Sequence, residues 1–145
     1  MKDRIFVDSN IFIYLYSTDE PEKQNISNKM IDKYPCIIST QVLNEFCNVC
    51  LKKFNKSVEE IELALIEINA NCDVTLIDNN TIKQALEIRK IYGYSYYDCL
   101  IVASALQSDC KYLITEDMAD GQMINKKLRI INIYSNNNVV KYFDI

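Results

Sequence analysis

The sequence predicts an α/β protein with a central parallel sheet of about five strands, and two observations support this. Short apolar runs typical of buried strands recur along the chain, and segments of helical length separate them. Strands that alternate with helices form a parallel sheet covered by helices on both faces. With 145 residues, only two of them glycine and two proline, we expect residues 1–145 to form a single domain. The predicted strands are 5–7, 36–39, 74–77, 111–115 and 129–133.

The first strand ends at a carboxylate. Asp8 follows Ile5-Phe6-Val7, and the next two residues, Ser9 and Asn10, favour helix N-termini. A short apolar helix is expected over 11–16, followed by an amphipathic helix over 22–33 that begins near Pro21. Asp8 should therefore lie at the carboxyl end of a strand and the mouth of a helix, where open α/β sheets bind ligands.

Two further helices are expected between the second and third strands. Thr40 is predicted to cap the first, whose apolar residues at 43, 46, 47, 50 and 54 recur at helical spacing. Ser57 is predicted to cap the second, in which apolar residues at 58, 61, 65 and 68 share one face. The third strand is the β-branched run 74–77.

The C-terminal half contains the most apolar helix. A helix over 81–92 stops at Gly93, and the run from Cys99 to Leu106 is so apolar that its helix must be largely buried. The fourth and fifth strands follow at 111–115 and 129–133. The pattern of residues 136–145 assigns them no element.

Composition limits the classes of function. The formal net charge of −4 argues against broad electrostatic coating of nucleic acid, although local basic clusters remain. There is no apolar run of about 20 residues and no export signal, so we expect a cytoplasmic protein that does not enter membranes. Six cysteines without any histidine are then expected to be reduced, small buried side chains, not a zinc site.

Acidic residues are predicted to gather at one edge of the sheet. Asp8 ends the first strand, Glu45 lies about one turn into the helix after the second, and Asp98 lies in the first turn of the buried helix. Asp117 and Asp120 follow the fourth strand. If the first and fourth strands are neighbours, these positions flank the point where a crevice opens.

Each carboxylate also has a structural explanation as a helix cap, a turn residue or an exposed helix residue. Together, however, four or five carboxylates repel one another unless some protonate or a cation lies among them. Oxygen ligands without histidine favour a hard ion, Mg²⁺ or Mn²⁺. Ser9, Asn10 and Thr115 are expected to orient the carboxylates or bound waters.

At these residues the chain resembles the PIN-domain nucleases, especially the bacterial VapC-like toxins of type II toxin–antitoxin systems. Val7-Asp8-Ser9-Asn10 is similar to the first acidic motif and Asn44-Glu45-Phe46 to the second. The third and fourth motifs, which are the most specific, are represented by Tyr96-Tyr97-Asp98-Cys99-Leu100-Ile101-Val102-Ala103-Ser104-Ala105 and Thr115-Glu116-Asp117-Met118-Ala119-Asp120-Gly121. The resemblance covers nearly the whole chain.

This resemblance implies a three-layer α/β/α fold and RNA cleavage that depends on Mg²⁺ or Mn²⁺. It assigns catalysis and metal ligation to Asp8, Glu45, Asp98 and Asp117, with Asp120 as a further candidate ligand. A water is expected to attack the phosphodiester in line, without a nucleophilic side chain. The resemblance also implies a homodimer and an antitoxin that occupies the site.

Two other interpretations are open at this point. A catalytically inactive PIN-like module that binds RNA or a protein would have a similar sequence. A phosphatase of the haloacid-dehalogenase type also places an aspartate at the end of the first strand, but it needs a second aspartate two residues later, where this chain has Asn10.

Overall fold

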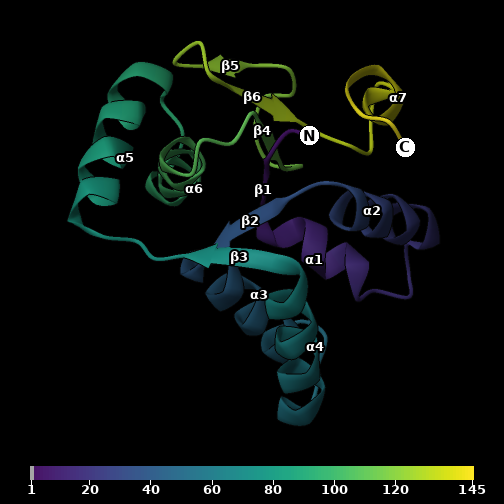
Figure 1. Ribbon diagram of the computed structural model, residues 1–145. Coiled ribbons are helices and arrows are strands. Elements are labelled where there is room, and N and C mark those ends of the chain that lie inside the picture. The colour runs from purple at the N-terminus through teal and green to yellow at the C-terminus, as the bar shows by residue number, and fades with distance from the viewer. Residues whose placement is uncertain (1) are drawn as a thin grey trace.

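The computed structural model describes residues 2–145, in which six strands form one sheet in the order β3-β2-β1-β4-β6-β5 (Figure 1). All neighbouring strands are parallel except β5 and β6. The predicted α/β fold is therefore confirmed, with a sixth strand of two residues added at one edge. The strands are β1 (Ile5–Val7), β2 (Cys36–Ser39), β3 (Cys72–Thr75), β4 (Tyr112–Ile114), β5 (Met123–Ile124) and β6 (Leu128–Ile131).

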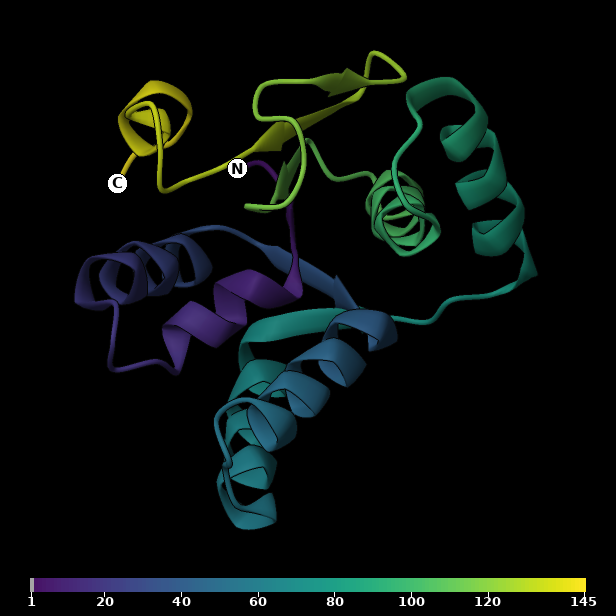
Figure 2. The ribbon, with the colours of Figure 1, turned by 180° about the vertical axis from the view of Figure 1, so that it is seen from behind.

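Helices cover both faces of the sheet. Connections between parallel strands are right-handed, so the helices between β1 and β3 lie on one face. The chain then crosses back from β3 to β4, and α5 and α6 pack together on the opposite face (Figure 2). The helices are α1 (Ser9–Leu15), α2 (Pro21–Lys33), α3 (Thr40–Lys52), α4 (Val58–Asn71), α5 (Asn79–Tyr92), α6 (Tyr96–Gln107) and α7 (Asn138–Tyr142).

The predicted buried helix is confirmed as α6. Seven consecutive residues, from Cys99 to Ala105, are buried beside the sheet. Ser57 caps α4 as predicted: its hydroxyl accepts a bond from the Glu60 backbone N–H, and its own backbone N–H donates to the Glu60 carboxylate. None of the helices within residues 2–145 is both long and apolar enough to cross a membrane.

The structure corrects two local predictions. The third strand spans 72–75, not 74–77, because Cys72 pairs with Cys36 of β2 whereas Leu76 has left the sheet and is 73% exposed. Thr40 is the first residue of α3; Ser39 occupies the N-cap position, with no side-chain cap bond. The tail, which had no predicted element, includes the short helix α7.

The strand order opens a crevice between β1 and β4. Val7 and Ile114, the last residues of these strands, are register partners. From β1 the chain proceeds outward to β2 and β3 on one side, and β4 and β6 lie on the other. The segments that follow the two central strands, beginning at Asp8 and Thr115, therefore meet at the ligand-binding edge of an open α/β sheet.

Candidate active site

Asp8 lies at the centre of the site and is only 3% exposed. It is the N-cap of α1, where Oδ1 accepts a hydrogen bond from the backbone N–H of Ser9 at 2.7 Å. Its Oδ2 accepts a bond from the Thr115 hydroxyl at 2.8 Å. Burial raises the pKa of Asp8 to about 6 despite these two bonds, and repulsion from Glu45 and Asp117 adds to the rise.

Glu45 is held against Asp8 by side chains from two helices. The Ser9 hydroxyl donates to Glu45 Oε2 at 2.9 Å, and Gln41 Nε2 donates to Glu45 Oε1 at 2.9 Å. Gln41 was not singled out in the sequence, although its i,i+4 spacing from Glu45 on α3 is a signal that could have identified it. Each oxygen of Glu45 thus accepts a hydrogen bond from a neighbouring side chain.

Asp117 is attached to the same network from the β4 side. Its backbone N–H donates to Thr115 Oγ1 at 3.2 Å, and Asn10 Nδ2 donates to its Oδ2 at 2.9 Å. Asn10 Nδ2 also lies 3.4 Å from Thr115 Oγ1. The three residues expected to orient carboxylates, Ser9, Asn10 and Thr115, therefore all contact them.

Asp98 approaches from the opposite face of the sheet, in the first turn of α6. Ser95 caps this helix by accepting a bond from the Asp98 backbone N–H at 3.2 Å. Burial raises the pKa of Asp98, the Ser95 hydroxyl opposes the rise, and repulsion from Asp117 and Glu45 reinforces it. Asp8 and Asp98 therefore experience the same two neighbouring carboxylates.

Asp120 lies in a different environment. Its oxygens accept bonds from the backbone N–H of Asn132 at 2.9 Å and from the side-chain amides of Asn136 and Asn138 at 2.9–3.0 Å. Burial alone would raise the pKa of Asp120, but the bonds from Asn132, Asn138 and Asn136 outweigh it and lower the pKa. The prediction that Asp120 is a ligand stays untested, and in the structure its carboxylate joins the turn after β4 to the segment before α7 and to Asn138, the first residue of α7.

Glu116 is neutralised by groups that sequence analysis did not connect to it. Lys23 Nζ lies 2.9 Å from its Oε2, and the Tyr14 hydroxyl donates to its Oε1 at 2.6 Å. Burial would raise the pKa of Glu116, but Tyr14 and Lys23 lower it overall. Because these residues are more than 90 positions apart, no local pattern reveals the contact. The charge of Glu116 is thus compensated, unlike the charges of the carboxylates around Asp8.

The four carboxylates match the requirements of a hard cation. Their donors are oxygens, and the charged groups that act most strongly on Asp8 and Asp98 are other carboxylates. Asn10 Oδ1 is buried without a hydrogen-bond partner within residues 2–145, which adds an unused acceptor at this edge. Over the same residues, no three acidic, cysteine or histidine side chains converge as a closed metal site.

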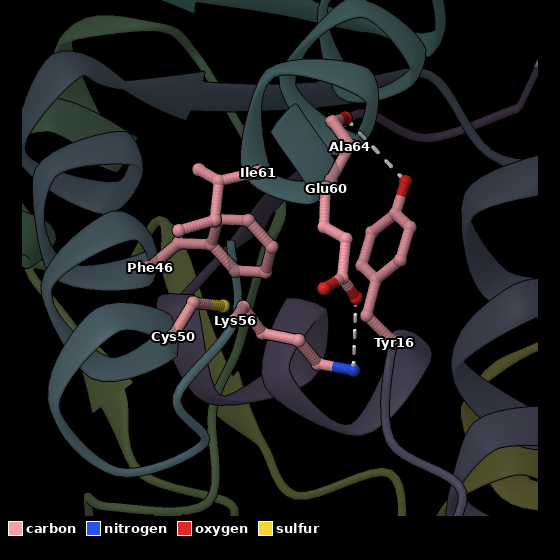
Figure 3. A pocket seen from close by; sticks show the side chains of 7 residues that line it. All are labelled: Tyr16, Phe46, Cys50, Lys56, Glu60, Ile61 and Ala64. Atoms are coloured by element: carbon pink, nitrogen blue, oxygen red, sulfur yellow. Dashed lines mark hydrogen bonds and ion pairs between the residues drawn. The ribbon is translucent and has the colours of Figure 1, made fainter. Parts of the chain in front are cut away.

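An apolar cavity lies away from this edge, between the C-terminal part of α3 and the start of α4 (Figure 3). Tyr16, Phe46 and Ile61 line it. Lys56 and Glu60 also line it and form an ion pair, with 3.7 Å between Lys56 Nζ and Glu60 Oε2. Because the charges here are paired, the cavity lacks the uncompensated charge found around Asp8.

Comparisons with known proteins agree with this fold. The sequence family described as the PIN domain matches residues 5–119. A comparison with curated protein sequences finds no match. A chain of a toxin–antitoxin complex from Klebsiella pneumoniae is similar with a TM-score of 0.69 and 19% identity, over 91% of this chain and 99% of that chain.

Two more solved structures are similar. The Mycobacterium tuberculosis toxin VapC20, described as cleaving the sarcin–ricin loop, has a TM-score of 0.61 and 17% identity, over 75% of this chain and 86% of that chain. A chain of VapBC2 from Rickettsia felis, solved with a fragment of promoter DNA, has a TM-score of 0.66 and 17% identity, over 89% and 99%. At such identities the likeness establishes the fold alone.

Proposed function

This chain belongs to the PIN-domain family, and we propose that it is an endoribonuclease dependent on Mg²⁺ or Mn²⁺ and the toxin of a toxin–antitoxin pair. The observation that carries the proposal is the set of carboxylates around Asp8, which repel one another and have no cationic side chain as their main partner. Such a set is costly to maintain in a folded protein unless a cation binds there.

In this proposal Asp8, Glu45, Asp98 and Asp117 hold the ion. When bound, Mg²⁺ or Mn²⁺ supplies an activated water and offsets negative charge on the phosphodiester. Ser9 and Gln41 hold Glu45, Thr115 holds Asp8, and Asn10 holds Asp117. These bonds keep three of the four carboxylates, those of Asp8, Glu45 and Asp117, at fixed positions before substrate arrives, which reduces the reorganisation needed in the reaction.

An RNA substrate and a protein partner are further parts of the proposal. The similar VapC20 is described as a sarcin–ricin-loop-cleaving toxin, which supports RNA as the substrate class. The similar Klebsiella chain comes from a toxin–antitoxin complex, which supports an antitoxin. Large apolar side chains are exposed on α4, at Leu63 and Ile66, and on α5, at Leu86 and Ile91. Such surfaces suit binding of an antitoxin and of a second copy of the chain.

The test is cleavage of mixed single-stranded and structured RNA in Mn²⁺, Mg²⁺ or EDTA. Asp8→Asn and Asp98→Asn remove one charge each from the site, and Asp32→Asn is the matched control, because Asp32 is exposed on α2. We expect metal-dependent cleavage by the wild type and Asp32→Asn, and loss of cleavage in the other two variants.

Two results would contradict the proposal. Cleavage that survives in Asp8→Asn and Asp98→Asn would have a source other than this site. Binding of Mn²⁺ without cleavage of any RNA in the pool would favour the inactive, binding PIN-like module.

A further inference from the structure

A cluster of three side chains lies directly beside the acidic site. It consists of Tyr14 of α1, Lys23 of α2 and Glu116, the residue before Asp117. The Tyr14 hydroxyl donates to Glu116 Oε1 at 2.6 Å, and Lys23 Nζ lies 2.9 Å from Glu116 Oε2 and 3.1 Å from the Tyr14 oxygen. Each member therefore contacts both others, and Glu116 is held at both of its carboxylate oxygens.

The other side of this cluster is fixed by Tyr134 and Ser27. The rings of Tyr14 and Tyr134 meet edge to face, with centroids 5.1 Å apart, and Lys23 Nζ lies 4.3 and 5.3 Å from these two centroids. Such aromatic contacts attract an ammonium group. The hydroxyls of Tyr134 and Ser27 share a hydrogen bond at 2.6 Å, and Ser27 is buried on α2. The cluster is thus joined to both α2 and the segment after β6.

Helix α1 contacts two consecutive residues of the segment after β4. Asn10 and Tyr14 are four positions apart and so share one face of the helix. Asn10 Nδ2 donates to Asp117 Oδ2 at 2.9 Å, while Tyr14 bonds to Glu116. Asp117 is exposed, and within residues 2–145 no other group hydrogen-bonds to its carboxylate. The position of Asp117 therefore depends on the backbone that Glu116 anchors.

We propose that Tyr14, Lys23 and Glu116 are positioning residues, which hold the segment after β4 so that the Asp117 carboxylate stays where the ion binds. The inference rests on the proposed function, because the ion is the one that the four carboxylates are proposed to hold. The three residues act through Asp117 and touch neither the ion nor the RNA.

An effect of charge alone would have the opposite sign. Lys23→Met removes a positive charge near the site and leaves the Glu116 carboxylate without its cation. By Coulomb attraction, both changes would strengthen the binding of Mn²⁺. If Lys23 instead positions Asp117, its loss weakens the binding of Mn²⁺. The direction of the change therefore separates the two roles.

The first experiment measures the affinity for Mn²⁺ by calorimetry, in the absence of RNA. Tyr14→Phe deletes one hydroxyl, keeps the ring against Tyr134 and changes no charge. We expect Tyr14→Phe and Lys23→Met each to weaken the affinity about tenfold, the lower end of the range for groups that orient metal ligands. Lys23→Arg should retain most of the affinity, because a guanidinium also pairs with a carboxylate.

The matched controls are Tyr16→Phe and Lys29→Met. Tyr16 ends α1, and its hydroxyl also bonds to a glutamate, Glu67, at 2.7 Å; Lys29 is an exposed lysine of α2. Both controls should bind Mn²⁺ like the wild type. Mn²⁺ binding that is unchanged in Tyr14→Phe, or unchanged or tighter in Lys23→Met, would overturn the proposal. Tyr14→Phe alone is a sufficient test if Lys23→Met does not fold.

The second experiment uses the metal-free protein. The side-chain amide signals of Asn10, which bonds to Asp117, are compared by NMR in the wild type, Lys23→Met and Lys29→Met. We expect these signals to shift in Lys23→Met, because the segment that carries Asp117 moves, and not in Lys29→Met. Asn10 signals that are the same in all three proteins would contradict the proposal.

RNA cleavage distinguishes failure of this inference from failure of the proposed function. At limiting Mn²⁺, kcat should fall in Tyr14→Phe while KM for RNA is unchanged, and saturating Mn²⁺ should restore kcat. A wild type that cleaves RNA, with Tyr14→Phe equal to Tyr16→Phe in Mn²⁺ affinity and kcat, would refute the positioning role alone. Weaker Mn²⁺ binding in Tyr14→Phe, in a protein that cleaves no RNA, would support the positioning role while the nuclease proposal fails.

Discussion

Asp8 and Asp120 are both aspartates at the same edge of the sheet, but their environments shift the pKa of the carboxyl group in opposite directions. Asp8 is buried, has two hydrogen-bond donors and faces other carboxylates, so its pKa rises to about 6. Asp120 is exposed, accepts bonds from three asparagines, and its pKa is lowered. The charge of Asp8 is costly to the fold, whereas the charge of Asp120 stabilises it. We therefore propose a functional role for Asp8 and a structural role for Asp120.

The largest expected effect distinguishes the two residues by activity. Asp8→Asn should reduce RNA cleavage more than about a hundredfold, since changes to groups that only orient metal ligands already cost about 10–100-fold. In EDTA the same variant should be about 1–3 kcal/mol more stable at pH 7, because it removes a charge whose pKa is raised. Cleavage rates and urea unfolding check these two effects.

Asp120→Asn is the comparison variant for that experiment. It should keep cleavage closer to the wild-type rate than Asp8→Asn does. Equal loss of cleavage in both variants would mean that Asp120 acts as a ligand despite its bonds to asparagine, and would remove the distinction.

A smaller effect is expected where the orientation of a carboxylate is changed but its charge is kept. Ser9→Ala deletes the hydroxyl that donates to Glu45 and should reduce cleavage about 10–100-fold, with a weaker affinity for Mn²⁺. Ser17→Ala is the control, because within residues 2–145 the Ser17 hydroxyl bonds only to the backbone N–H of Asp19. If Ser9→Ala cleaves RNA like Ser17→Ala, the Ser9 bond does not position Glu45 for the reaction.

Asp120→Ala tests the structural side of the comparison. The substitution leaves the amides of Asn136 and Asn138 without their shared acceptor, and we expect the free energy of unfolding to fall by about 1–2 kcal/mol. Urea unfolding measures this change. If the variant has the same midpoint of urea unfolding as the wild type, these bonds do not stabilise the C-terminal segment.

The smallest effect is the pH dependence of stability in EDTA, where the two residues act in opposite directions. Between pH 3.8 and about 6 the folded state holds a proton on Asp8 that the unfolded state has lost, so the Asp8 contribution falls as the pH rises. The pKa of Asp120 is lowered, so its contribution is present above the ordinary aspartate range and is lost as the pH falls through the folded pKa.

Unfolding from about pH 2 to pH 7 checks these signs. Asp8→Asn should remove the decline that occurs toward neutral pH, whereas Asp120→Ala should reduce the loss of stability at acid pH. A wild-type curve that rises between pH 4 and 6 as steeply as that of Asp8→Asn would contradict the raised pKa.

Several features followed from local sequence because each depends on neighbouring residues. The period of apolar residues predicted α3 and α4, the continuous apolar run predicted the buried helix α6, and Ser57 was identified as the cap of α4. The third strand was misplaced because its bounds depend on pairing with β2, which a β-branched run does not encode. The two residues of β5 are too few for any period.

The acidic set illustrates the same division. Sequence alone determined that Asp8, Glu45, Asp98 and Asp117 follow or precede strands in a way that places them at one edge, since strand direction fixes the edge of a parallel sheet. Only the tertiary structure decided which carboxylates are compensated. Glu116 is paired with Lys23 and Asp120 with asparagines, while Asp8 is buried and has only like charges, those of Glu45 and Asp117, acting on it. Compensation depends on distances between residues remote in the chain, and folding alone brings those residues together.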